Sequence, residues 1–132
     1  MKDFSLSRNE RVKKKNDFEK VYSSAKILFS SDLLIKSLYI IDPDKQFIGV
    51  KIVPAVSKKA GKAVWRNRVK RLIKESYRLN KSTLLRKTLE KKVGILIIFS
   101  PNKLSESKNK KLYLKDIYKS VVELINKIEQ QI

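Results

Sequence analysis

The sequence predicts a small α+β sandwich, in which helices cover one mixed β-sheet. The chain has 132 residues, the length of one compact domain, and its 42% hydrophobic residues suffice for a core. Short runs of β-branched and aliphatic residues alternate with segments of helical periodicity. One run, residues 93–100, is almost wholly apolar, which is typical of a strand buried on both faces. We therefore expect a single domain over residues 1–132, with residues 1–12 as a mobile basic arm.

The first half of the chain predicts one short helix and two strands. The helix would begin at Asn16, a residue type favoured at helix N-caps, and end near Ala25. The strands would cover residues 33–41 and 47–53 and form a hairpin, because turn residues lie between them. Pro54 would end the second strand, since proline cannot donate a hydrogen bond to the ladder.

The second half predicts helices on either side of the apolar strand, after a weakly marked third strand at residues 55–57. In chain order we expect a principal helix, a short helix, the buried strand, an exposed loop and an amphipathic closing helix, over residues 63–79, 82–91, 93–100, 101–111 and 112–132. The resulting alternation of strands and helices is the pattern of an α+β fold.

The charge balance indicates a polyanionic partner. Lys and Arg number 32 against 13 Asp and Glu, a formal net charge of +19. Such an excess destabilises a compact chain by self-repulsion unless an anion offsets it. Nucleic acid is the first candidate, and an anionic membrane surface is the second. We expect a cytoplasmic protein without a membrane anchor, because no long apolar run, signal-peptide pattern or Cys is present.

The side-chain chemistry argues against a nuclease site built from protein residues. The chain has no His and no Cys, which removes the commonest acid–base residue near neutral pH and the thiolate nucleophile. Its carboxylates are scattered, and the one close pair, Asp42 and Asp44, flanks Pro43 as in a turn. No metal-ligand spacing is visible. We therefore expect no catalytic side chain and no metal site, so that any RNA cleavage would need another catalyst.

The densest signal lies in residues 57–78, where nine basic residues meet one acid, Glu75. At about 100° per residue, one arc of the expected helix is largely apolar and the other is basic. The first arc holds Trp65, Val69, Leu72, Ile73 and Ser76. The second holds Arg66, Asn67, Lys70, Arg71, Lys74 and Arg78, with Arg68 at the border. Like charges one turn apart destabilise a helix, so a face of one sign indicates phosphate binding rather than solvation.

The charge pattern does not decide whether the partner is RNA or DNA. No helix-turn-helix, zinc, zipper or RNA-recognition-motif pattern is visible. Phe18 and Tyr22, on the expected first helix, could stack on unpaired bases or pack in the core. We expect the hydroxyl of Tyr22 to make core burial less favourable there than at Phe18.

The run from Ser57 to Glu75 closely resembles the signature of the bacterial ribonuclease P protein subunit. That family has a Ser-Lys-Lys turn, a Gly, an Ala-Val step and then Arg-Asn-Arg and Lys-Arg on one helix, all of which occur here in that order. Residues 17–22 also resemble its first helix, and residues 47–50 its second strand. The resemblance implies a two-layer sandwich like the second domain of ribosomal protein S5, with a mixed four-stranded sheet, about three helices and a left-handed β-α-β crossover.

The resemblance also implies a role in ribonuclease P, the endoribonuclease that removes the 5′ leader from precursor tRNA. In this family the RNA subunit catalyses cleavage with Mg²⁺, which the RNA and the substrate mainly bind, and the protein assists. The implied partners are the RNase P RNA and precursor tRNA, with no membrane and no obligate protein partner. The residues implied at the RNase P RNA are Lys58, Lys59, Arg66, Asn67, Arg68, Lys70, Arg71 and Lys74. Those implied at a cleft for the single-stranded leader are Lys14, Phe18, Tyr22 and Lys36.

Four positions depart from the family pattern, and two other functions fit the charge. Lys36 stands where many relatives carry an aromatic residue, Lys62 replaces a common Asn, Lys74 replaces a common Arg, and Trp65 is larger than usual.

The first alternative function is that of a structural RNA-binding protein of the ribosomal kind. The second is a nonspecific binder of nucleic acid or membrane surfaces, which selective binding at high salt would exclude.

Overall fold

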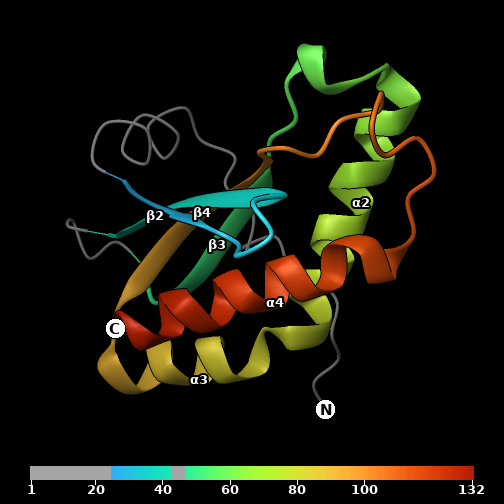
Figure 1. The fold of residues 1–132 in the computed structure, drawn as a ribbon. Coiled ribbons are helices and arrows are strands. Elements are labelled where there is room, and N and C mark those ends of the chain that lie inside the picture. The colour runs from blue at the N-terminus through green and yellow to red at the C-terminus, as the bar shows by residue number, and fades with distance from the viewer. Residues whose placement is uncertain (1–24, 43–46) are drawn as a thin grey trace.

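The computed structural model describes residues 25–42 and 47–132 (Figure 1). Its elements are, in chain order, β1 (Lys26–Phe29), β2 (Ile35–Ile41), β3 (Gly49–Pro54), the 3-10 helix η2 (Lys58–Ala60), α2 (Ala63–Asn80), α3 (Ser82–Lys91), β4 (Gly94–Pro101) and α4 (Leu114–Gln130). The predicted basic arm and the predicted helix that begins at Asn16 lie outside the described residues. The other predicted helices, and three of the predicted strands, are confirmed with ends that differ by at most two residues.

The four strands form one mixed sheet in the order β1-β2-β4-β3. β4 is a central strand, antiparallel to β2 and parallel to β3. Its residues from Gly94 to Phe99 are all buried, which confirms the prediction of a strand buried on both faces. The parallel neighbours β3 and β4 are joined through η2, α2 and α3, so the chain makes the expected β-α-β crossover. The handedness of this crossover stays a prediction.

Two predictions about the strands are wrong, and one strand was not predicted. Residues 33–41 and 47–53 do not form a hairpin, because β4 lies between β2 and β3. In the central position β4 pairs its backbone N–H and C=O groups with a neighbouring strand along both edges, which an edge position would not allow. Residues 55–57 form no strand and lead into η2. The sequence interpretation also misses β1, whose four residues are too few to show a period-two pattern.

The main core lies between the sheet and the three helices, as expected for a two-layer sandwich. Figure 1 shows α4 crossing in front of the strands, with α3 below it and α2 beside it. Buried side chains of the strands, such as Ile35, Ile52 and Ile97, belong to one cluster with those of the helices, such as Ile73 and Leu124. The helices therefore cover one face of the sheet.

A second, smaller apolar cluster lies on the opposite face of the sheet. Leu96 and Ile98 alternate along β4 with the residues that face the helices, so their side chains point the other way. Leu38 and Val53 from the neighbouring strands pack against them. This face carries Lys36, one of the residues implied at the leader cleft, since Lys36 and Leu38 are two residues apart on β2.

Candidate nucleic-acid interface

The inner face of α2 fixes the helix in the core. The buried residues of the helix are Trp65, Val69, Ile73, Ser76 and Tyr77. Four of them confirm the predicted apolar arc, and the fifth, Tyr77, was not part of it. Leu72, also on that arc, is half-buried and packs against the core. The basic side chains of α2 are thus displayed by a helix whose position is set by the sheet and by α4.

The outer face of α2 carries cations, but its borders differ from the predicted ones. Asn67, Arg71 and Lys74 are exposed, as expected. Arg66 and Lys70 are half-buried rather than on the far side, because they precede the buried Ile73 by seven and three residues and so lie beside the inner face. We call this basic outer face of α2 the basic strip. Its fully exposed part centres on Arg71.

Two arginines of α2 are held in place by backbone carbonyls. The Nε–H of Arg66 donates to the carbonyl of Gly61 at 3.1 Å, and the Nε–H of Arg68 donates to the carbonyl of Leu112 at 2.7 Å. A guanidinium has five N–H donors in a planar fork. One bond through Nε orients each fork and leaves its other donors for the phosphate oxygens of a partner.

The N-terminal end of α2 is strongly electropositive. Lys58 and Lys59 of η2 are exposed, and the exposed Lys62 is the N-cap residue of α2. The first turn of the helix contains no acidic residue. The helix dipole adds a positive partial charge at this end, where proteins usually place Asp or Glu. One carboxylate, that of Glu106 in the loop after β4, accepts the backbone N–H of Lys62, but the three lysines outnumber it, so the arrangement still favours an external anion.

The basic strip weakens towards the C-terminal end of α2. Arg78 pairs with Glu75 across one helical turn, through two hydrogen bonds to the carboxylate. The hydrogen bond from Arg78 holds the pKa of Glu75 below its ordinary value, so this carboxylate is charged at neutral pH. The pair partly neutralises Arg78, and the cations best placed for a partner are those between Lys58 and Lys74.

Lys36 lies on a different surface, the sheet face opposite the helices. Its cross-strand neighbours are Phe29 of β1 and Ser100 of β4. Phe29 is 43% exposed, and Ile27, two residues earlier on the same face, is 53% exposed. A lysine beside an exposed aromatic ring suits a single-stranded nucleic acid, since the ring can stack on a base while the lysine attracts the backbone. The sequence interpretation does not include Phe29 because it misses β1.

The structure thus separates the predicted contacts into two groups. The eight residues implied at the RNase P RNA gather on η2 and α2, at one end of the molecule (Figure 1). Lys36, by contrast, lies on the opposite sheet face. The other residues implied at the leader, Lys14, Phe18 and Tyr22, lie outside the described residues and stay predictions.

The loop between β4 and α4 is a neighbour of α2 that the sequence interpretation leaves out. The indole Nε1–H of Trp65 donates to the carbonyl of Asn109 at 2.9 Å. The backbone N–H of Lys62 donates to the Glu106 carboxylate at 2.8 Å, so this side chain caps the first turn of α2. The one available signal in the sequence was the high lysine content of this loop.

Two kinds of feature do not occur in the described part of the chain. Within residues 25–42 and 47–132, no three acidic side chains, His or Cys lie close enough together to hold a metal ion. None of the helices in these ranges is long and apolar enough to cross a membrane.

Comparison with known proteins identifies the family. The family model described as Ribonuclease P matches residues 6–129. The ribonuclease P protein component of Clostridioides difficile is 37% identical over 124 residues, which are 94% of this chain and 96% of that protein. The corresponding protein of Clostridium kluyveri is 40% identical over 117 residues, 89% of this chain and 92% of that protein.

A solved structure supports the same assignment. The RNase P protein of Staphylococcus aureus superposes with a TM-score of 0.67 at 26% sequence identity, over 90% of this chain and 94% of that one. This likeness agrees with the α+β sandwich described above. Because the family model covers nearly the whole sequence and the relatives match over most of their length, the chain belongs to the ribonuclease P protein component family.

Proposed function

We propose that this chain is the RNA-binding subunit of ribonuclease P and assists a catalytic RNA in removing the 5′ leader from precursor tRNA. The observation that carries the proposal is the basic surface of η2 and α2, on a fold shared with this family. Each phosphate that a lysine or arginine neutralises releases counterions, so several such contacts give strong, salt-dependent binding to a large RNA. Membership of the family supports RNase P RNA as that partner.

We propose that the RNA subunit, rather than the protein, catalyses the cleavage. The chain has no His or Cys, which would be the usual groups for acid–base or nucleophilic work. We propose that Mg²⁺ is bound mainly by the RNA subunit and the substrate. The protein's cations offset phosphate repulsion when these two RNAs come together, which lowers the magnesium concentration that they need.

We further propose that the single-stranded leader lies along the sheet face opposite the helices. Lys36 would attract its backbone, and the exposed ring of Phe29, directly across from Lys36, would stack on a base. This pairing offers an account of why a lysine serves at a position where many relatives carry an aromatic residue. In this chain the ring would come from the neighbouring strand β1.

The decisive experiment is multiple-turnover cleavage of a 5′-extended precursor tRNA by a bacterial RNase P RNA at low magnesium, with and without the protein. We expect cleavage at the mature 5′ end to appear only with the protein. If the protein binds the RNA but changes neither the cleavage rate nor the magnesium requirement, the proposal fails. A structural RNA-binding role, tested by co-sedimentation with ribosomes, would then be the better account.

The leader proposal has its own test. Lys36→Gln should weaken binding of precursor tRNA to the holoenzyme more than binding of mature tRNA, because only the precursor has the leader. Lys26→Gln is the matched control, since Lys26 is an exposed lysine of the same sheet whose neighbour Tyr39 faces the helices. Equal losses for the two tRNAs in the Lys36 variant would argue against a leader contact.

A further inference from the structure

We infer that the loop between β4 and α4, residues 102–113, forms with η2 a second phosphate-binding surface for the RNase P RNA. This surface would continue the basic face of α2 beyond the signature helix. The inference deepens the proposed function and rests on it. It assigns a binding role to lysines that lie 28 to 36 residues after Glu75, the end of the signature.

The charge of this surface is nearly of one sign. Its exposed lysines are Lys58, Lys59 and Lys62 before α2, and Lys103, Lys108, Lys110 and Lys111 in the loop. Glu106 is the one acidic residue between positions 102 and 113. Within residues 25–42 and 47–132, none of the seven lysines forms an ion pair with a carboxylate. Seven like charges repel one another, and an external polyanion would offset this repulsion.

The loop is docked on α2, so its lysines are carried on a fixed frame. Leu104 and Leu112 are both only 2% exposed and anchor its two ends in the core. The backbone N–H of Glu106 donates to the carbonyl of Ala60 in η2 at 2.8 Å. Bonds from α2 to Asn109 and Leu112 complete the docking. In Figure 1 this loop, drawn in orange, lies beside the N-terminal part of α2. A frame of this kind reduces the entropy lost when the lysines bind.

A hollow of about 470 Å³ lies where the loop meets η2. The residues that line it are Lys59, Ala60, Gly61, Lys62, Glu106, Ser107 and Lys110. Three of them are lysines: Lys59 and Lys62 come from the segment of η2, and Lys110 comes from the loop. Gly61 allows the two segments to approach closely, because a Cβ at this position would lie 2.7 Å from the Trp65 ring and 2.8 Å from the Cβ of Glu106. The carboxylate of Glu106 is already engaged, since it accepts the N–H of Lys62.

The position of this surface favours the RNase P RNA over the leader as its partner. Lys58 to Lys62 lead directly into α2, and Lys111 precedes Leu112, whose carbonyl orients Arg68. A folded RNA bound along α2 would therefore meet the loop as well. Lysines are flexible point charges that suit the phosphate backbone rather than base edges, so we expect contacts without sequence preference. The proposed leader surface belongs to the other face of the sheet.

The test compares two triple variants in binding to RNase P RNA over a series of salt concentrations. The first is Lys108→Gln with Lys110→Gln and Lys111→Gln. The control removes three exposed cations of α3 and α4: Arg86→Gln with Lys91→Gln and Lys119→Gln. Each lost phosphate contact should lower the slope of log affinity against log salt by about 1, so the loop variant should lose about 3 and the control much less. Circular dichroism checks that both variants fold.

Equal slopes for the loop variant and the control would overturn the inference. So would a loss that appears only when precursor tRNA is bound to the holoenzyme, since the phosphates would then be those of the substrate. Failure of the proposed function looks different, because the unmodified protein would then leave the cleavage of precursor tRNA unchanged.

A variant that should bind RNase P RNA more tightly, rather than more weakly, provides an independent check. Glu106→Gln keeps an oxygen that accepts the N–H of Lys62 but removes the negative charge from the lysine cluster. We expect this variant to bind RNase P RNA roughly twofold more tightly at low salt, with the gain vanishing at high salt. Weaker binding by a folded Glu106→Gln variant would count against an electrostatic role for the loop.

Discussion

The helices α2 and α4 share one core but use their outer faces differently. Both are amphipathic, both pack on the same face of the sheet, and they lie against each other. α2 has a basic outer face, and within residues 25–42 and 47–132 its one ion pair with a carboxylate is that of Arg78 with Glu75. The outer face of α4 carries both acidic and basic residues. Asp116 lies in its first turn and Lys127 in its last turn.

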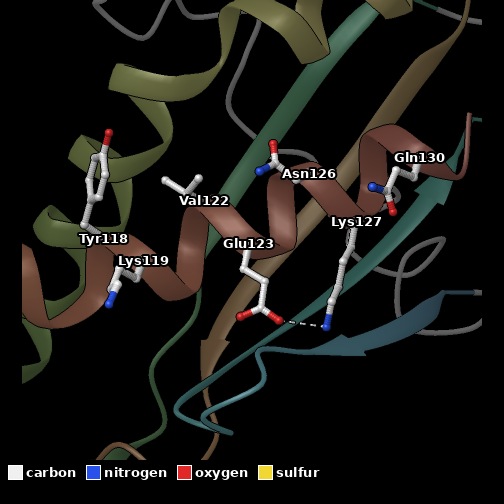
Figure 2. Close-up of a pocket in the computed structure, with 7 residues that line it drawn as sticks. All are labelled: Tyr118, Lys119, Val122, Glu123, Asn126, Lys127 and Gln130. Carbon is white, nitrogen blue, oxygen red and sulfur yellow. Dashed lines mark ion pairs between the residues drawn. The ribbon is translucent and has the colours of Figure 1, made fainter.

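The charged residues of α4 stabilise the fold itself. Figure 2 shows the outer face of this helix, where Glu123 and Lys127 form an ion pair of 2.9 Å. Glu123 also accepts hydrogen bonds from the backbone N–H and the hydroxyl of Ser31, and Lys127 donates to the carbonyl of Phe29 at 3.0 Å. These bonds tie α4 to the turn between β1 and β2. Glu123 and Lys127 are therefore engaged within the protein.

On these two helices of similar length, a binding face differs from a solvated one in the placement of its charges. A helix that serves only the fold places opposite charges one turn apart and complements its own dipole. α4 does both, whereas α2 begins with cations and has no acid in its first turn. The Glu106 carboxylate bonds to the N-cap of α2, but one acid does not offset the cations of this helix, and an external polyanion would supply the remaining negative charge.

The largest expected effects concern what the two helices have in common, their buried faces. Ile73 of α2 and Leu124 of α4 are both fully buried in the main cluster. Ile73→Ala and Leu124→Ala should each lower the free energy of unfolding by about 2–5 kcal/mol, because both remove apolar contacts and leave a cavity. Urea unfolding followed by circular dichroism measures this. A loss below about 1 kcal/mol for one helix would show that it is not an equal part of the core.

The common core explains why most of the fold was predictable. The helices α2, α3 and α4 and the strand β4 follow from local patterns of apolar residues, which core packing strengthens. The order of the strands does not follow from such patterns. Placing β4 between β2 and β3 depends on pairs of residues that are 45 to 66 positions apart, and the short strand β1 has too few residues to show a pattern.

The candidate site was predictable to a different degree in each of its parts. The signature residues from Lys58 to Lys74 are neighbours in the sequence, so one helix and the turn before it bring them together. Phe29 and the loop lysines could not be assigned in this way. The ring of Phe29 meets Lys36 only through strand pairing, and Lys111 lies near Arg68 only because the loop docks on α2.

The second prediction separates the outer faces by charge reversal. Arg71→Glu should weaken binding of RNase P RNA by about 1–3 kcal/mol, since it removes an exposed cation from the strip and adds repulsion. Lys119→Glu makes the same change at an exposed residue of α4 and should have a much smaller effect. Filter binding at moderate salt measures both, with unfolding curves as the control. Similar losses for the two variants would show that only net charge matters, and would remove the distinction between the helices.

The third prediction concerns pH and the network on α4. Burial raises the pKa of Glu123, but hydrogen bonds from Lys127 and Ser31 outweigh this effect and hold the pKa below its ordinary value of 4.5. Burial likewise opposes the hydrogen bonds from Ser30, Leu34 and Ser120 that hold the pKa of Asp32 below 3.8. The contribution of both carboxylates is therefore fully present at neutral pH. It is lost as the pH falls below about 4.5, because the unfolded chain then takes up protons first.

The Glu123→Gln variant tests this account of the network. It should lower the free energy of unfolding by roughly 0.5–1 kcal/mol at pH 7, since the ion pair with Lys127 is lost. The difference from the unmodified protein should shrink as the pH approaches 3, while binding of RNA at pH 7 should stay unchanged. A difference that is constant with pH would mean that the charge of Glu123 does not contribute to stability.

The smallest expected effect concerns the pair of Glu75 and Arg78. Here α2, like α4, places opposite charges one turn apart. Glu75→Gln removes the single acid of the signature helix and with it the negative charge that pairs with Arg78. The cost to stability should be about 0.3–0.5 kcal/mol, the usual value of an exposed pair within a helix. Binding of RNase P RNA should tighten by a similar amount at low salt, because the basic strip then extends one turn further. If Glu75→Gln weakens binding instead, the pair itself contributes to the interface, and the boundary between the binding part and the folding part of α2 lies beyond Arg78.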